Sequence, residues 1–532
     1  MGSHGLPYAP KGTSVSSSLS RRDLMRSAAA GGLGIAIAGS IEAIAGPAAA
    51  QAAQAGVGKT IGYGPVVADP AGLLALPKGF SYKIVAQAGK TVLESGEPTP
   101  SDADGTGCFR GRDGWVLVNN HEIGGGEPYG VPALPGLTYD PGAKGGTTTI
   151  EVDRDGNRVR EYVSVAGTHN NCAGGITPWD TWLTCEETEQ RAGGAFQKDH
   201  GYVFEVDPFD REANKNPVPL KFLGRYSHEA VAVNPRNSEI YLTEDASGPN
   251  GLYFRWTPPH GFRGRKGALR ALALGPGGDT AGKLQAMRCR KGSRHIADLS
   301  EATQPGTRYK VEWVDVPDRD ARTTSVRKQF TDDQITRSRK LEGAWWGDGG
   351  AYFVASYARH DDGSVNEHDG QVWFYDPESE TVTLKTIFGV NPDPEQDTNY
   401  DGPDNITVSP YGGVILAEDG EGLSHLVGVT DKGTPYPMAR NELNDSEFTG
   451  RRSATTAASC SPTSRPPATS SRSPVPGRRS TTATGTTDPV TRPPHRHRWG
   501  GAVFPLGFRR VARPGRIRRR RRGGRGPGCR AR

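Results

Sequence analysis

The sequence lacks several signatures by which enzymes and membrane proteins are commonly recognised. No Gly-x-Ser-x-Gly nucleophile elbow, Walker-type phosphate loop or dinucleotide-binding glycine fingerprint occurs in a fitting context. Convincing amphipathic helices are few. One weakly apolar stretch, 28–41, is short and ends next to Glu42, so it does not predict a stable transmembrane helix. These absences weigh against serine hydrolases, nucleotide-dependent enzymes and stable membrane insertion.

Lysine is absent from the C-terminal segment 451–532, which instead contains 21 Arg and a single acid, Asp488. The net charge of this segment is +20, whereas residues 1–450 carry a net charge of −14, and the whole chain therefore has +6. The basic balance therefore belongs to this tail, and it predicts no nucleic-acid binding by the preceding domain.

The change of composition at Gly450 permits two interpretations. Segment 451–532 can be a disordered basic tail, because Pro, Ser and Arg without large apolar residues cannot bury enough surface to fold. Alternatively, one base lost near codon 450 has shifted the reading frame. With degenerate bases chosen freely, 451–477 then back-reads as ATFSDDGRVLFANIQTPGHVFAITGPW, which predicts a strand, an Asp-Asp-Gly turn and a second strand. We favour the frameshift.

The N-terminus predicts an export signal. Arg21 and Arg22 precede the stretch 28–41, and small-residue A-x-A sites follow within 50–55. Paired arginines, a modest apolar region and a small-residue cleavage site are typical of a twin-arginine signal. We therefore expect residues 1–55 to engage the twin-arginine export machinery and the mature protein to be periplasmic or secreted. Because this pathway carries folded proteins, it mildly favours a metal site.

The remaining body, 56–450, predicts an all-β fold. Short alternating runs closed by Gly, Asp, Asn or Pro turns recur at 114–119, 147–153, 201–207, 239–243, 351–355, 371–376 and 413–417. Strands this regular favour a β-propeller of six blades, with a multi-sheet sandwich as the alternative because no strict repeat exists. Segment 261–310 predicts an excursion from the strand pattern, and 332–340 a short helix.

A propeller closes by pairing its terminal strands. If its last C-terminal strands are missing or replaced by the tail 451–532, an unpaired edge remains that invites aggregation. We therefore expect the polypeptide as written to have low stability and little or no activity.

Polar clusters stand close to several of the predicted strands. They occupy 120–122, 171–175, 184–187, 227–229, 243–245, 341–343, 401–405 and 417–420. In a propeller, equivalent strand ends converge on the central channel, where six or more carboxylates repel one another unless cations neutralise them. Oxygen ligands in this number suit Ca²⁺, or Fe³⁺ where an anionic soft ligand joins them.

Cysteine and histidine within these clusters have more than one interpretation. Cys172, in a glycine-rich loop, is interpreted as a thiolate metal ligand, and a disulfide between Cys172 and Cys185 is the alternative. His121 and His228 are interpreted as structural or as supporting the ligands, with direct metal binding as the alternative.

The longest distinctive motif is NCAGGITPWDTWLTCEE at 171–187. It is followed in order by HEA at 228–230, TED at 243–245, LEG at 341–343 and DGPDN at 401–405. Together these motifs resemble the PhoX family of alkaline phosphatases. The resemblance implies a six-bladed propeller that holds two Fe³⁺ and three Ca²⁺ around a bridging oxo group. The family's last strands also resemble the back-read string at IQTPG and ITGPW.

The resemblance further implies roles for single residues. The iron-side ligands would be Cys172, Glu244 and Glu342. Candidates for calcium binding or for supporting the ligands are Glu122, Glu186, Glu187, Glu229, Asp404, Glu418 and Asp419. The family is expected to hold phosphate with a cation two residues before the Glu of the Glu-Gly pair. Here that cation is Lys340, with Arg339 beside it, and Lys lacks the bidentate fork of Arg.

The sequence thus predicts a monomeric, metal-dependent hydrolase of small phosphomonoesters that serves extracytoplasmic phosphate scavenging. The metals and Lys340 would give an acidic domain a local positive field for its anionic substrate. One rival is another metal-dependent propeller hydrolase, such as a phosphodiesterase or a lactonase, which a substrate panel would separate. The other is a non-catalytic Ca²⁺-binding propeller, favoured if iron and a visible thiolate–iron absorption band are absent.

Overall fold

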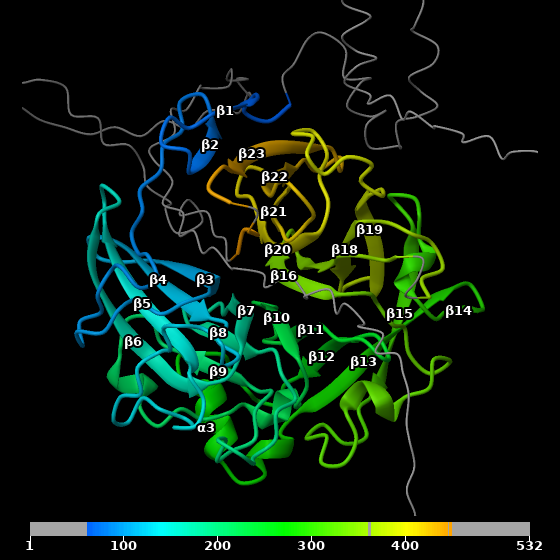
Figure 1. Ribbon diagram of the computed structural model, residues 1–532. Helices are drawn as coiled ribbons and strands as arrows, with labels where there is room; N and C mark the ends of the chain where they lie inside the picture. The colour runs from blue at the N-terminus through cyan, green and yellow to red at the C-terminus, as the bar shows by residue number, and fades with distance from the viewer. Residues whose placement is uncertain (1–60, 360–362, 445, 450–532) are drawn as a thin grey trace, which may run out of the picture. The chain divides into compact units, whose positions relative to one another are not determined.

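The computed structural model describes residues 61–359, 363–444 and 446–449, all of which lie in one compact unit. The leader 1–55 and the tail 451–532 lie outside the described residues, so both assignments stay predictions. Regular structure in the described residues is almost entirely antiparallel β (Figure 1). Within these residues, no helix has both the length and the apolar character needed to cross a membrane.

The strands of the described residues form four hydrogen-bonded sheets. We divide the largest of them at β15 into sheets 3 and 4, which gives five sheets numbered in chain order. Sheet 1 contains β3 (Ala103–Arg110), β4 (Gly114–His121), β5 (Gly145–Asp153) and β6 (Arg158–Thr168). Sheet 2 contains β7 (Asn171–Ile176), β8 (Trp182–Glu186) and β9 (Val203–Val206). Sheet 3 contains β10 (His228–Val233), β11 (Ile240–Glu244), β12 (Tyr253–Thr257) and β13 (Lys283–Lys291). Sheet 4 contains β16 (Leu341–Gly347), β17 (Gly350–Ala355), β18 (Gly370–Asp376) and β19 (Thr381–Phe388). Sheet 5 contains β20 (Pro403–Val408), β21 (Val414–Glu418), β22 (His425–Val429) and β23 (Pro435–Asn441).

The remaining strands extend the outer edges of these sheets. β15 (Arg308–Asp315) pairs with both β13 and β19 and so joins sheets 3 and 4, and β14 (Arg294–Ile296) pairs with β13. On sheet 5, β2 (Leu74–Pro77) pairs with β23, and β1 (Val66–Val67) pairs with β2. The N-terminal strands therefore lie beside the last strand of the described chain.

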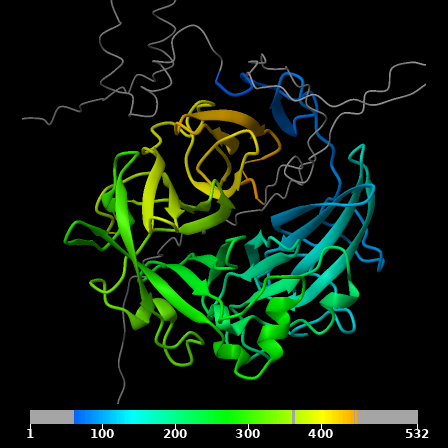
Figure 2. The same cartoon turned by 180° about the vertical axis from the view of Figure 1, so that it is seen from behind.

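Hydrophobic clusters lie between consecutive sheets. They contain Val118 and Trp182 between sheets 1 and 2, Val203 and Val231 between sheets 2 and 3, Ala232 and Phe353 between sheets 3 and 4, and Val354 and Leu416 between sheets 4 and 5. The first strands of consecutive sheets also pack against each other, and the sheets are arranged about a common centre (Figure 2). This is the arrangement of propeller blades, and the predicted all-β propeller class is confirmed.

Every run predicted as a strand overlaps one, in β4, β5, β9, β11, β17, β18 and β21. The short helix predicted at 332–340 is wrong, because residues 332–334 form a turn and Arg337 forms isolated bridges with Leu252 and Asp298. Segment 261–310 is an excursion only in part, since it contains β13 and β14 as well as helix α3 (Ala268–Leu274). Single turns of 3₁₀ helix are η1 (Glu212–Asn214), η2 (Lys221–Leu223), η3 (Gly278–Thr280), η4 (Leu299–Glu301) and η5 (Val326–Gln329).

Candidate metal centre

The first strand of every sheet presents an acid or a cysteine at its second residue. These residues are Asp104 on β3, Cys172 on β7, Glu229 on β10, Glu342 on β16 and Asp404 on β20. In all five sheets the pairing with the second strand is irregular at this point. Such irregularities turn a side chain out of the regular pleat and are common next to functional sites. The five strands lie around the centre of the sheets in Figure 1.

These residues meet further acids that follow the second strands. Four overlapping groups have their ligand atoms within 4.8 Å of one another: Asp104, Glu122 and Cys172; Cys172, Glu187 and Glu229; Glu229, Glu342 and Asp404; and Asp404, Asp419 and Glu447. Each group shares one residue with the next, so they form one continuous acidic centre. All five sheets contribute to it, together with Glu447, which follows sheet 5.

Burial and mutual repulsion oppose ionisation in this centre. Burial, followed by the charges of Glu342 and Asp404, raises the pKa of Glu229 well above its usual range. Burial is also the first cause of the raised pKa of Glu342 and of Asp404. Carboxylates placed this closely are stable in their charged form only beside cations.

The Cys172 thiol lies among carboxylates, with Sγ 3.2 Å from Glu229 Oε1 and 3.5 Å from Asp104 Oδ2. Burial, then the charges of Asp104 and Glu229, raises its pKa well above the usual range. A metal would reverse this effect, because a coordinating thiol is deprotonated. The donor set of one thiolate and many carboxylate oxygens fits hard cations, with a softer metal such as iron at the thiolate.

The backbone at Cys172 is held by Asn120. Asn120 Nδ2 donates to the carbonyl oxygens of Cys172 and Ala173, each at 2.7 Å, and Trp182 Nε1 donates to Asn120 Oδ1 at 2.9 Å. A Cβ at Gly105 would lie 2.6 Å from Ala173 Cα, so glycine is required for this approach of β3 to β7. These contacts fix the position of the thiol between sheets 1 and 3.

The alternative of a disulfide between Cys172 and Cys185 is wrong, since both cysteines are free. Cys185 is fully buried in the cluster between sheets 2 and 3, whereas Cys172 lies in the acidic centre.

Lys340 is a cation at the edge of the centre. Its Nζ lies 3.1 Å from Glu342 Oε1 and 3.8 Å from Asp419 Oδ2. The Glu342 carboxylate raises the Lys340 pKa and outweighs burial, so the side chain stays charged. Its φ of 36° is in the left-handed region, a strained conformation that is frequent at functional sites. Arg339, beside it, pairs instead with Asp298 at 2.9 Å.

Three of the predicted ligands lie outside the four groups. Each is the last residue of a second strand and has another close partner: Glu186 with His200 at 2.7 Å, Glu418 with His425 at 2.9 Å, and Glu244 with Arg327 at 3.3 Å. Successive residues of a strand face opposite ways, so the next residue in each chain segment is directed to the centre instead. The structure thus brings together seven of the predicted ligands, namely Cys172, Glu122, Glu187, Glu229, Glu342, Asp404 and Asp419.

The two histidines of the polar clusters have structural partners. His121 lies between the Ser101 carbonyl and the Thr148 hydroxyl, each 2.9 Å away, and His228 Nε2 lies 3.1 Å from the Gly224 carbonyl. Burial lowers the pKa of both, that of His228 to about 3. Neither is a member of the acidic groups.

Sequence reasoning missed Asp104 and Glu447, and it included Asp245 in the polar cluster 243–245 without giving it a role. Asp104 is the second residue of the first strand of sheet 1, as Cys172 is of sheet 2, and this equivalent position was the signal that could have identified it. Asp245 faces Lys340 and Asp419, whose charges act on its pKa in opposite directions while burial raises it. Glu447 stands three residues before Gly450, where the composition changes, and the strand pattern that would have shown its equivalence to the first-strand residues is absent from the sequence that follows.

The sheets and the acidic centre define an all-β, propeller-type protein with a candidate site for several cations. A family model described as alkaline phosphatase PhoX matches residues 61–463. The chain therefore belongs to the PhoX alkaline phosphatase family, a family of metal-dependent phosphatases.

A comparison with curated proteins found no match. Among solved structures, a gluconolactonase from Xanthomonas campestris is 10% identical over 69% of this chain and 92% of its own, with a TM-score of 0.28. TolB from Acinetobacter baumannii is 9% identical over 63% of this chain and 78% of its own, with a TM-score of 0.26. Likeness at this level carries no argument about function.

Proposed function

We propose that the protein hydrolyses small phosphomonoesters outside the cytoplasm, with Fe³⁺ and Ca²⁺ held in the acidic centre. The single observation that carries this proposal is Lys340 beside four overlapping groups of metal-ligating side chains. Family membership supplies the reaction class, and the geometry supports a place where an anion can bind despite the surrounding acids.

The groups containing Cys172 are the candidates for iron, because thiolate is the soft donor of the centre. The groups made of carboxylates alone, around Glu342 and Asp404, are the candidates for Ca²⁺. When bound, these cations would withdraw charge from the phosphoryl oxygens and favour attack on phosphorus.

The side chains of the chain itself position the substrate. Lys340 would donate to a phosphoryl oxygen, and Glu342 and Asp419 hold its Nζ at the rim of the centre. Asn170 Nδ2 donates to Glu122 Oε1 at 3.1 Å and to Glu187 Oε2 at 3.2 Å, so it fixes two acids from different sheets. This fixed arrangement lowers the cost of orienting the reacting groups.

The test compares the 532-residue polypeptide and a frame-restored chain, each incubated with Fe³⁺ and Ca²⁺, on p-nitrophenyl phosphate, bis-p-nitrophenyl phosphate and lactones. We expect hydrolysis of the monoester by the frame-restored chain, and its loss in Glu342→Ala. The matched control is Glu378→Ala, whose side chain is 71% exposed and distant in sequence from the centre. Full metal-dependent activity in Glu342→Ala would refute the role of the acidic centre in phosphomonoester hydrolysis. Turnover of lactones alone or of diesters alone would instead identify the protein as a lactonase or a phosphodiesterase.

The N-terminal segment 1–55 is proposed to direct export of the protein. Export by the twin-arginine machinery would give a periplasmic or secreted monomer. Fractionation of cells that carry Arg21→Lys/Arg22→Lys tests the export, because loss of the paired arginines should retain the protein in the cytoplasm. Retention of export in this variant would remove the twin-arginine assignment and leave the proposed chemistry intact.

A further inference from the structure

In four of the five sheets, a backbone hydrogen bond ties the end of the second strand to the start of the first. The residue directly after the second strand donates its N–H to a carbonyl two positions before the first-strand residue that enters the acidic centre. The donor and acceptor pairs are Glu122 and Asp102 at 2.9 Å, Glu187 and Asn170 at 2.9 Å, Ser356 and Lys340 at 2.8 Å, and Asp419 and Gly402 at 2.8 Å. All four acceptor residues are in the left-handed region, with φ between 36° and 53°. We call this bond the strand tie.

In sheet 2 the strand tie lies beside the buried carboxylate of Glu186. Its Oε1 accepts from His169 N at 2.9 Å and lies 2.7 Å from His200 Nδ1. Its Oε2 accepts from Gly201 N at 2.8 Å and from Tyr202 N at 3.0 Å. A carboxylate has about four acceptor positions, so these four contacts leave none for a cation. The first donor stands three positions before the cysteine of the centre, and the last two directly precede β9. Glu186 therefore joins the starts of the first and third strands.

A second carboxylate holds the imidazole of His200 from the other side. His200 Nε2 lies 3.3 Å from Asp140 Oδ2. Asp140 is itself fixed by the backbone N–H groups of Gly142 at 2.7 Å and of Gln197 and Lys198 at 2.8 Å. The side chains of His200 and Asp140 are fully buried. We call Glu186, His200 and Asp140 the sheet 2 clamp.

Sheet 5 repeats this arrangement with different residues. Glu418 Oε1 accepts from Asp401 N at 2.9 Å, and its Oε2 accepts from His425 N at 2.7 Å and lies 2.9 Å from His425 Nδ1. His425 Nε2 lies 3.1 Å from the half-buried Asp397, which also pairs with Arg440 at 2.8 Å. The first donor again stands three positions before the residue that enters the centre, and His425 begins the third strand. We call Glu418, His425 and Asp397 the sheet 5 clamp.

Sheet 4 shows that the strand tie forms without a clamp. The last residue of its second strand is Ala355, which has no side-chain acceptor. Ser356 N nevertheless donates to the Lys340 carbonyl. The clamps are therefore not a requirement of the strand tie, and what they add is a fixed orientation of the segments on either side of it.

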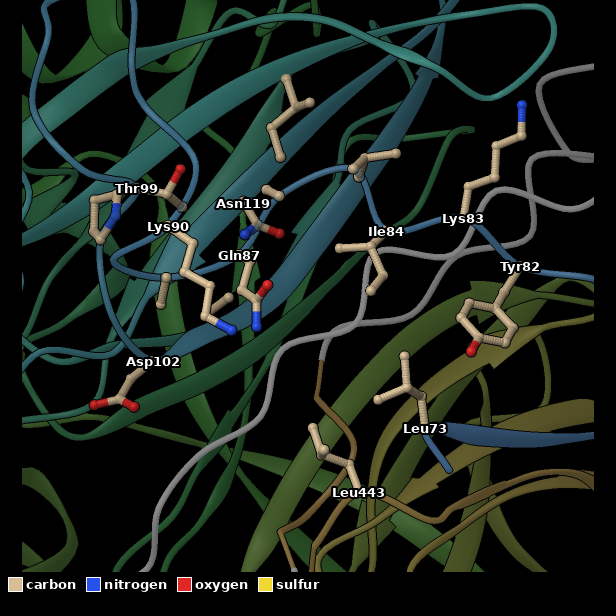
Figure 3. A pocket seen from close by; sticks show the side chains of 16 residues that line it. Leu73, Tyr82, Lys83, Ile84, Gln87, Lys90, Thr99, Asp102, Asn119 and Leu443 are labelled. Carbon is tan, nitrogen blue, oxygen red and sulfur yellow. The ribbon is translucent and has the colours of Figure 1, made fainter. Parts of the chain in front are cut away.

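The clamps are separate from the cavity in Figure 3. This cavity has a volume of about 480 Å³, and Tyr82, Gln87 and Leu443 contribute to its wall. Among the described residues that line it, none belongs to a clamp. The histidines and glutamates of the clamps are buried in the protein. A change in a clamp would therefore act on the centre through the neighbouring ligands.

We propose that the two clamps position the metal ligands beside them. The sheet 2 clamp would orient Cys172 and Glu187, and the sheet 5 clamp would orient Asp404 and Asp419. A ligand that is already held in place loses less conformational freedom when a cation binds. Partners that orient metal ligands typically account for about 10–100-fold in metal affinity. The inference rests on the cations of the proposed function, and it does not depend on the reaction.

Metal binding by the 532-residue protein tests the sheet 5 clamp without any turnover. Ca²⁺ alone is titrated into metal-free protein and followed by isothermal titration calorimetry. His425→Leu should weaken Ca²⁺ binding about 10–100-fold, because Asp404 and Asp419 lose their fixed orientation. His425→Asn should bind Ca²⁺ within about threefold of the wild type, because the amide nitrogen can replace Nδ1 beside Glu418.

The sheet 2 clamp has a different signature, because its ligands include the thiol. His200→Leu should shift or weaken the visible thiolate–iron absorption band that forms when Fe³⁺ is added, and His425→Leu should leave this band unchanged. The matched control is His295→Leu on β14, where Nε2 lies 2.9 Å from the Ile335 carbonyl. This variant should change neither the band nor Ca²⁺ binding.

Several outcomes would overturn the proposal. They are wild-type Ca²⁺ affinity in His425→Leu, no gain from Leu to Asn, and a loss of equal size in His295→Leu. If a Leu variant does not fold by circular dichroism, Asp140→Asn and Asp397→Asn keep the side-chain volume and should still weaken the band and Ca²⁺ binding respectively. Unchanged readouts in both would equally overturn the proposal.

The wild type separates this inference from the proposed reaction. A wild type that binds both cations without hydrolysing a phosphomonoester would refute the reaction, and the clamp variants would still decide the inference. A wild type that binds neither cation would overturn both.

Discussion

Glu229 is the carboxylate that two of the acidic groups share, and Glu229→Gln should change stability in opposite directions with and without metal. Its ligand atom lies within 4.8 Å of those of Glu342 and Asp404 in one group and of Cys172 and Glu187 in the other. At an effective dielectric constant near 20, two unit charges about 4.8 Å apart repel by about 3.5 kcal/mol. Without metal at pH 8, the variant should therefore be more stable by about 3 kcal/mol.

The difference in metal-free stability between Glu229→Gln and the wild type must depend on pH in a defined direction. The folded-state pKa of Glu229 is raised above its ordinary value of 4.5, so the folded protein binds the proton more tightly than the unfolded chain does. Stability of the metal-free wild type then falls as pH rises above about 4.5, and Gln removes this contribution. We expect the variant and wild type to be alike near pH 4 and to diverge progressively toward pH 8.

With metal the sign should reverse, because Gln lacks the charge that offsets the cations. The assay is urea unfolding of metal-free and metal-loaded protein at several pH values, with metal content measured by mass spectrometry. Glu378→Gln is the control and should change neither form, since its side chain is 71% exposed. A variant that is less stable than the wild type without metal at pH 8 would refute the electrostatic account of the centre.

Three further predictions concern single side chains. Lys340→Met in the frame-restored chain should raise KM for p-nitrophenyl phosphate at least tenfold, because it removes one charged hydrogen bond of about 1.5–3 kcal/mol. Arg339→Met should leave KM within about twofold, but it should lower the unfolding temperature because Asp298 loses its partner. Equal effects of the two on KM would contradict their different placement. Cys172→Ser should abolish any visible thiolate–iron absorption band while Cys185→Ser retains it, and a band that survives in Cys172→Ser would exclude this thiol as the ligand. Burial raises the pKa of Glu244 to about 8 against the opposing charge of Arg327, so its contribution to the free energy of unfolding is lost as pH rises from about 4.5 to about 8. Glu244→Gln should therefore make the free energy of unfolding less dependent on pH over that range. An unchanged pH dependence would refute the raised pKa of Glu244.

The strands were predictable because apolar and polar residues alternate in them and turn residues close them. The location of the centre was also predictable, since the acids near the strand ends converge in a propeller. Which acid faces the centre was not. Glu186 and Glu187 are adjacent acids of opposite orientation, and only the pairing of β8 with its neighbours decides that Glu187 reaches Cys172 while Glu186 meets His200.

Asp104 shows a second limit of the sequence. Its approach to Cys172 depends on the irregular pairing of β3 with β4 and on the close contact of Gly105 with Ala173. Neither feature leaves a mark in hydrophobic periodicity, because a single extra residue in a strand shifts the pattern without breaking it. Arg339 and Lys340 are a similar case, since the positive φ of Lys340 separates the directions of two neighbouring cations.

The distribution of the acidic centre over all the sheets has a consequence for biosynthesis. The ribosome delivers Asp104 first and Glu447 last, with the other ligands in between. The centre therefore gains donors throughout translation and receives its last one only when almost the whole body has been made. A nascent chain would bind cations progressively more tightly as it lengthens. Tight cation binding would therefore indicate that synthesis has passed sheet 5.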